Sequence, residues 1–111
     1  MINIDDFKKL DIRLGTIKEA VKIPETDRLV KLSIDFGTEI RQIISGIAVY
    51  YPDTGVLIGK QVPVIVNLEP RLIKGYESNG MVLYAIEEKD GKENLTTLEP
   101  GEALGNGSIV R

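Results

Sequence analysis

The clearest pattern along the chain is an alternation of apolar and polar residues between Leu29 and Phe36. Val30, Leu32 and Ile34 share one side of this pattern with Phe36, and the residues between them are polar or charged. An alternation with a period of two is typical of a strand that buries one face. We therefore predict a β-strand here, with its even-numbered residues in a core.

The rest of the chain predicts further short strands and almost no helix. Around Gly15 the apolar residues of the first strand change face, which indicates a bulge or a tight bend. The run from Gly80 to Ile86 is nearly continuous in apolar residues, as in a strand buried on both faces. A short helical turn is expected at residues 4–10, where two aspartates suit a helix N-terminus. The other strands are expected at residues 11–21, 40–47, 61–67, 94–98 and 107–110.

Turn signals separate these strands at short, regular intervals. Such spacing predicts an all-β fold, either a small barrel or a sandwich. Five well-formed strands with a glycine bend in the first favour the OB-fold, a five-stranded barrel that often binds oligonucleotides. At 111 residues the chain is long enough for one core, so we expect a single domain over residues 1–111.

The composition excludes several kinds of chemistry. The chain has no cysteine and no histidine, which excludes disulfides, thiolate catalysis, imidazole bases and the usual zinc sites. It has no glycine-rich phosphate loop, so we expect no catalytic residue, no metal site and no cofactor. No apolar run approaches the ~20 residues of a membrane span, and the N-terminus does not resemble a signal peptide. We therefore expect a cytoplasmic protein with no membrane partner.

The net charge of −3 argues against a general nucleic-acid binder. The charge is unevenly distributed: residues 1–84 carry 11 basic and 11 acidic side chains, whereas residues 85–111 carry 3 basic and 6 acidic ones. A neutral body leaves room for a basic patch on one face. We therefore expect weak non-specific attraction to phosphate, no DNA partner, and RNA binding that depends on shape.

The stretch from Asn67 to Met81 places glycines, asparagines, a proline and two cations between two apolar runs. This mixture is typical of a long hairpin connection and also of a binding loop, because glycines allow close approach and polar groups offer hydrogen bonds. Two other features leave similar alternatives open. Ser45-Gly46 indicates a strand bulge or a groove, and Tyr50-Tyr51 indicates core packing or base stacking.

Several short motifs stand in order along the chain. They are residues 7–17 (FKKLDIRLGTI), 26–29 (TDRL), 41–48 (RQIISGIA), 67–70 (NLEP), 74–75 (KG), 77–78 (ES) and 80–81 (GM). Together they resemble the signature of the tRNA-binding domains. That family includes small structure-specific tRNA-binding proteins, the C-terminal extension of many methionyl-tRNA synthetases, and EMAP-II-like domains. The resemblance covers nearly the whole chain and implies an OB-fold followed by extra C-terminal β structure, in a homodimer.

The resemblance also implies a set of residues that contact tRNA. Cations would meet phosphates, hydroxyl and amide groups would bond to sugar and phosphate, and a glycine and a methionine would allow close contact. These residues are Arg13, Lys31, Arg41 and Lys74, then Ser45, Asn67 and Ser78, and finally Gly80 and Met81. On this interpretation, Lys74→Ala and Ser78→Ala weaken tRNA binding and leave the melting temperature nearly unchanged.

We therefore expect a non-catalytic, structure-specific tRNA-binding module that assists an aminoacyl-tRNA synthetase, of the methionyl type, in cis or in trans. One alternative is an export chaperone of the CsaA type, which binds unfolded peptides and shares residues 4–7 (IDDF) and 34–39 (IDFGTE). Another is a purely structural dimerisation domain. The end of the central stretch, residues 78–81 (SNGM), is more similar to the tRNA-binding branch.

Overall fold

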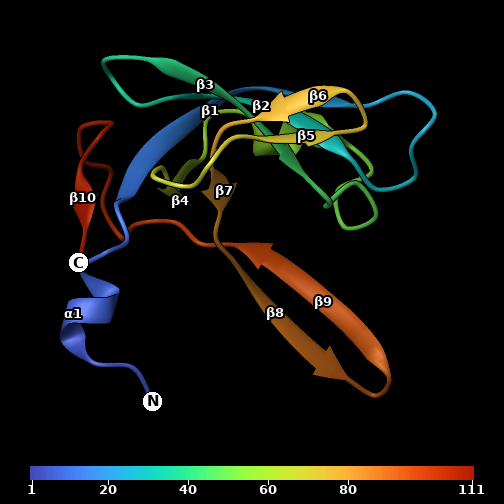
Figure 1. The fold of residues 1–111 in the computed structure, drawn as a ribbon. Helices are drawn as coiled ribbons and strands as arrows, with labels where there is room; N and C mark the ends of the chain where they lie inside the picture. Colours follow the sequence, from blue (N-terminus) through green and yellow to red (C-terminus); the bar gives the residue numbers. More distant parts are fainter.

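A computed structural model describes the whole chain, residues 1–111, and most of its elements are strands (Figure 1). The elements are α1 (Ile4–Phe7), β1 (Ile12–Lys22), β2 (Val30–Asp35), β3 (Ile40–Ser45), the 3-10 helix η1 (Thr54–Leu57), β4 (Gln61–Ile65), β5 (Arg71–Ile73), β6 (Tyr76–Ser78), β7 (Met81–Val82), β8 (Tyr84–Lys89), β9 (Lys92–Thr97) and β10 (Ile109–Val110). No helix has the length and hydropathy needed to cross a membrane.

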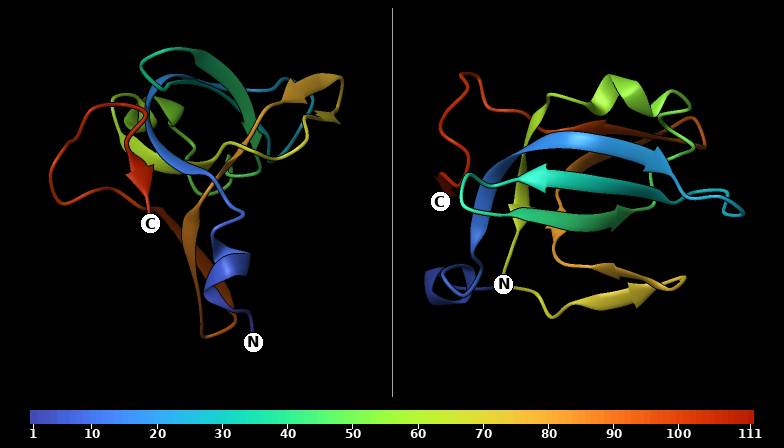
Figure 2. Two further views of the ribbon diagram at one scale, coloured as in Figure 1. Left: turned by 60° about the vertical axis from the view of Figure 1, so that its left-hand side comes forward. Right: turned by 90° about the horizontal axis from the view of Figure 1, so that it is seen from above.

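Six strands form an antiparallel sheet, five of them in the order β3-β2-β1-β4-β7, with β10 paired to β1. The left view of Figure 2 shows this sheet curled into a barrel. Its inward side chains form most of a cluster of 13 buried residues, which includes Val30, Leu32 and Ile34, with Phe36 just after β2. The predicted all-β, OB-type barrel is confirmed, and so is the strand that the alternation predicted.

The barrel closes along a seam between β3 and the segment at the end of β6. No ladder joins β3 to β7; instead the Asn79 N–H donates to the Gln42 carbonyl at 2.9 Å. The Ser78 hydroxyl accepts from the Ile44 N–H at 3.0 Å, and the Gln42 side-chain amide donates to the Glu77 carbonyl at 3.0 Å. Side chains therefore replace part of the backbone pairing that closes the barrel.

Gly15 of β1 lies against the core. A Cβ added there would lie 2.6 Å from Cγ2 of Ile34 and 2.8 Å from the Phe36 ring, so the packing requires glycine. The predicted bulge is displaced: the register between β1 and β2 shifts between Ile17 and Glu19. Gly15 itself pairs in regular register with β4, so its role is close packing and the irregularity comes later in the strand.

The apolar run at residues 80–86 does not form one buried strand, contrary to our expectation. It breaks at Leu83, and the chain leaves the barrel to form the β8–β9 hairpin, hereafter the arm, which extends away from the barrel in Figure 1. Met81 and Ile86 are 47% and 60% exposed. Val82 stays in the core, whereas Ile86 lies outside it because the arm leaves the barrel.

Tyrosine hydroxyls join the arm to the barrel. Tyr84 at the base of the arm donates to the Ser45 hydroxyl at 3.0 Å, and the Tyr51 hydroxyl accepts from the backbone N–H of Thr97 at 3.2 Å. Tyr50 donates to a glutamate carboxylate of β9. The rings of Tyr50, Tyr51 and Tyr84 pack against the core cluster. Of the two interpretations of Tyr50-Tyr51, the structure therefore shows packing.

Candidate nucleic-acid interface

The central stretch folds as a small hairpin made of β5 and β6. Its turn consists of Lys74 and Gly75, which have φ angles of +52° and +85°. Positive φ at both central residues is the mark of a type I′ turn, whose twist matches that of the flanking strands. The hairpin connects β4 to β7, the fourth and fifth strands of the barrel. In OB-folds this connection, the loop between strands 1 and 2, and the face of strands 2 and 3 bind oligonucleotides.

Two clefts lie along the hairpin. The base cleft, about 430 Å³, has a wall that is partly apolar and is lined by Ile44, Leu68, Glu69, Pro70, Arg71, Ser78, Gly80 and Met81. The tip cleft, about 460 Å³, lies between the turn of the hairpin and the loop after β1, and is lined by residues 25–29 with Ile73 and Lys74. In the right view of Figure 2 the hairpin lies beside β3, and its turn points the same way as that loop.

Four cations lie at or near these clefts: Arg28, Lys31, Arg71 and Lys74. We call the two clefts and these four cations the hairpin face. Arg28 and Lys74 line the tip cleft, and Arg71 lines the base cleft. Lys31 projects from the outer side of β2, with its ammonium 5.7 Å from the centre of the Tyr76 ring. None of the four forms an ion pair with a carboxylate. Sequence reasoning missed Arg28 and Arg71.

Arg13 and Arg41, which we also expected to meet phosphates, lie together in a separate cleft of about 180 Å³. Nε of Arg13 lies 2.6 Å from the Asp11 carboxylate, and its hydrogen bond to that carboxylate raises the pKa of Arg13. Arg41 pairs with Glu39 and donates to the Val66 carbonyl at 2.6 Å. Since a carboxylate beside each cation offsets its charge, both arginines attract phosphate less than the four free cations do.

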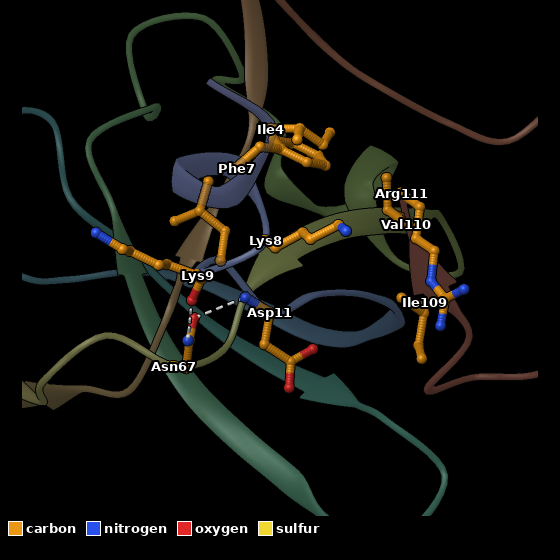
Figure 3. Close-up of a pocket in the computed structure, with 10 residues that line it drawn as sticks. Ile4, Phe7, Lys8, Lys9, Asp11, Asn67, Ile109, Val110 and Arg111 are labelled. Carbon is orange, nitrogen blue, oxygen red and sulfur yellow. Dashed lines mark hydrogen bonds between the residues drawn. The ribbon is translucent and has the colours of Figure 1, made fainter. Parts of the chain in front are cut away.

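The expected hydrogen-bonding residues, Ser45, Ser78 and Asn67, all have partners inside the protein. Ser45 and Ser78 are 7% and 4% exposed, and their hydroxyls hold the arm and the seam. Asn67 accepts from the Asp11 N–H at 2.9 Å and donates to the Lys9 carbonyl at 2.7 Å (Figure 3). Because contact with RNA would compete with these bonds, we assign the three groups to the fold. Ser45 ends β3 in regular register, so this pair forms no bulge, and Gly46 after it is exposed with open space around it.

Of the next two expected residues, Gly80 serves the packing of the barrel, whereas Met81 is open to a ligand. Gly80 has φ +136°, and an added Cβ would lie 3.1 Å from the Ile65 carbonyl oxygen and 3.2 Å from Cδ1 of Ile43. Glycine is therefore required by the packing at the edge of the barrel, whatever else approaches it. Met81 is half exposed in the base cleft, where its flexible side chain is available for a ligand.

Comparison with known families gives the context for this face. A family model described as "Putative tRNA binding domain" matches residues 12–108. The chain belongs to the tRNA-binding domain family. Among curated proteins, the methionine–tRNA ligase of Bacteroides fragilis is 48% identical over 110 residues, which cover 99% of this chain and 16% of the ligase. The chain thus spans only a small part of the curated relatives it matches, and the family to which it belongs is one of binding domains.

Solved structures of two kinds resemble this tRNA-binding domain over its whole length. A MetRS-related protein from Pyrococcus horikoshii has a TM-score of 0.90 and 35% identity, with coverage of 100% of this chain and 98% of that chain. The chaperone CsaA from Bacillus anthracis has a TM-score of 0.85 and 32% identity, with coverage of 100% and 99%. The resemblance inferred from the motifs is confirmed, including its kinship with the CsaA chaperones.

Proposed function

We propose that residues 1–111 act as one non-catalytic tRNA-binding unit, and that the hairpin face meets the sugar–phosphate backbone of the RNA. The observation that carries this proposal is the group of four cations without carboxylate partners. They lie where an OB-fold binds oligonucleotides, in a chain of the tRNA-binding domain family. Contacts of this kind position an RNA and carry little base identity.

The test is a filter-binding titration with unfractionated tRNA at several salt concentrations. If about four cations contact phosphates, log K should fall with log salt at a slope of roughly −3 to −4. Lys74→Ala and Arg71→Ala should each weaken binding to all tRNAs alike and reduce the slope by about one. Lys89→Ala is the matched control, because it removes an exposed cation from the arm. A slope near zero, or an equal effect of Lys89→Ala, would contradict the proposed interface.

A role beside an aminoacyl-tRNA synthetase is part of the proposal, because the curated relatives are methionine–tRNA ligases. Such a module would hold tRNA for a methionyl-type synthetase, in cis or in trans, in the cytoplasm. We also propose a homodimer, since one small barrel offers a limited face and two copies related by symmetry would double it. Light scattering at micromolar concentration should give twice 12.3 kDa, and a mass of 12.3 kDa would exclude the dimer.

Peptide binding is the second candidate function. It is favoured by the apolar part of the base cleft, formed by Leu68, Pro70 and Met81, and by the similarity to a CsaA chaperone. The two functions make different predictions for competition. Under the tRNA proposal, an unfolded apolar peptide should fail to displace labelled tRNA. Under the peptide-binding alternative, Met81→Ala should weaken peptide capture and leave the salt slope for tRNA unchanged.

A further inference from the structure

Tyr76 differs from the other three tyrosines in what it contacts. The hydroxyls of Tyr50, Tyr51 and Tyr84 each make a hydrogen bond within the protein, and their rings pack against the core cluster. Tyr76 does neither, since its hydroxyl has no hydrogen bond and its ring lies outside the packing around the core. An aromatic ring that makes no hydrogen bond and lies outside the core is available for a ligand.

The position of Tyr76 places this ring beside the cations of the hairpin face. Tyr76 begins β6 directly after the Lys74-Gly75 turn and is partly exposed. The Lys31 ammonium lies over the ring, 5.7 Å from its centre. Residues two apart on a strand point to the same face. Arg71 therefore lies on the same side of the hairpin as Ile73 and as Tyr76, the cross-strand partner of Ile73. The ring thus lies against one of the cations that we assign to phosphate and on the same side of the hairpin as a second.

We propose that Tyr76 is a stacking platform for an unstacked nucleobase of the bound RNA. The inference rests on the proposed function, because it takes the hairpin face as the RNA-binding surface. Lys31 covers one side of the ring and orients it, and a base stacks on the other side. The phosphates on either side of that base then lie within reach of the surrounding cations, so stacking and charge act on the same nucleotides.

This contact has a consequence for what the domain selects. Every base has a π-face, so stacking on Tyr76 carries little sequence preference. A base inside a continuous duplex has no free face, however, and cannot reach the ring. Tyr76 therefore favours RNAs that present a base outside a helical stack, which gives a protein of low net charge a way to discriminate by shape.

The experiment compares the parent with Tyr76→Leu, which keeps apolar bulk, and with Tyr76→Phe, the matched control that keeps the ring. Affinity is measured for mixed tRNA and for a blunt-ended RNA duplex, and melting temperature is measured beside it. Stacking is worth roughly a 5- to 150-fold change in affinity per base, so Tyr76→Leu should lose that much for tRNA. Tyr76→Phe should bind like the parent, and neither variant should change affinity for the duplex or the melting temperature.

A second measurement detects stacking directly. A single-stranded RNA with 2-aminopurine should lose fluorescence on the parent and on Tyr76→Phe, and keep it on Tyr76→Leu. Equal tRNA affinity for Tyr76→Leu and the parent would overturn the inference and leave the proposed function intact. Equal losses in Tyr76→Leu and Tyr76→Phe would also overturn it, since the hydroxyl would then be the contact. If the parent quenches the single strand but does not bind tRNA, the proposed function fails and the stacking platform stands.

Discussion

Ser78→Ala is expected to destabilise the barrel, which reverses the expectation drawn from the sequence. The Ser78 hydroxyl accepts from the backbone N–H of Ile44 across the seam at 3.0 Å, and Ser78 is 4% exposed. Alanine leaves that buried N–H without its acceptor, a loss of roughly 1–3 kcal/mol in the free energy of unfolding. For a chain of this size the change corresponds to a fall of about 4–12 °C in melting temperature.

Urea denaturation followed by circular dichroism measures this loss, with Ser33→Ala as the matched control. Ser33 lies on the outer side of β2, and its hydroxyl makes no hydrogen bond within the protein. Amide hydrogen exchange gives a local readout: the Ile44 amide should lose protection in Ser78→Ala, while the amides of β1 that pair with β4 keep theirs. If Ser78→Ala is as stable as Ser33→Ala but binds tRNA several-fold more weakly, the hydroxyl contacts RNA and our assignment of Ser78 to the seam is wrong.

Two further predictions concern the barrel and the arm. Gly15→Ala should cost about 1–3 kcal/mol in urea denaturation, because its Cβ would overlap Ile34 and Phe36, whereas Gly46→Ala, with open space around it, should cost little. Burial raises the pKa of Tyr84 to about 12, so the folded state favours the neutral phenol. This pKa difference contributes about 2–3 kcal/mol to the free energy of unfolding. The contribution should be complete below pH 10 and disappear as the pH rises towards 12. Denaturation at pH 9 and pH 12 should show a smaller drop for Tyr84→Phe than for the parent, and equal drops would contradict this cause.

The sequence predicted the barrel well because the barrel depends on local patterns. The alternation in β2 is a property of neighbouring residues, and the family motifs are short and stand in order. The arm could not be predicted in the same way. Its position depends on hydrogen bonds from Tyr84 to Ser45 and from Thr97 to Tyr51, between residues 39 and 46 positions apart. No local pattern reports such partners.

The ion pairs of Arg13 and Arg41 did have a signal in the sequence. Residues two apart on a strand lie on the same face, so Asp11 is placed to neutralise Arg13 and Glu39 to neutralise Arg41. The same spacing also places Glu69 near Arg71, which forms no ion pair, so the spacing points to a candidate partner and the structure decides between the arginines. No local signal predicted that Lys74 lies in the turn of the hairpin, because lysine is uncommon at the positive φ that a type I′ turn requires.

On the proposed interface the hairpin has two tasks, one carried by its first strand and turn and the other by its second strand. Its turn and the start of β5 carry Lys74 and Arg71, which have no ion-pair partner in the fold, whereas its last residues, 77–79, hold the seam. A loss of tRNA binding after a substitution at Ser78, or at its cross-strand partner Arg71, can therefore arise from an opened barrel, whereas a substitution of Lys74 at the turn tests contact with RNA more directly. If the proposed interface is right, one short segment serves both the closure of the barrel and the binding of RNA, which is why stability must be measured beside affinity for every variant in it.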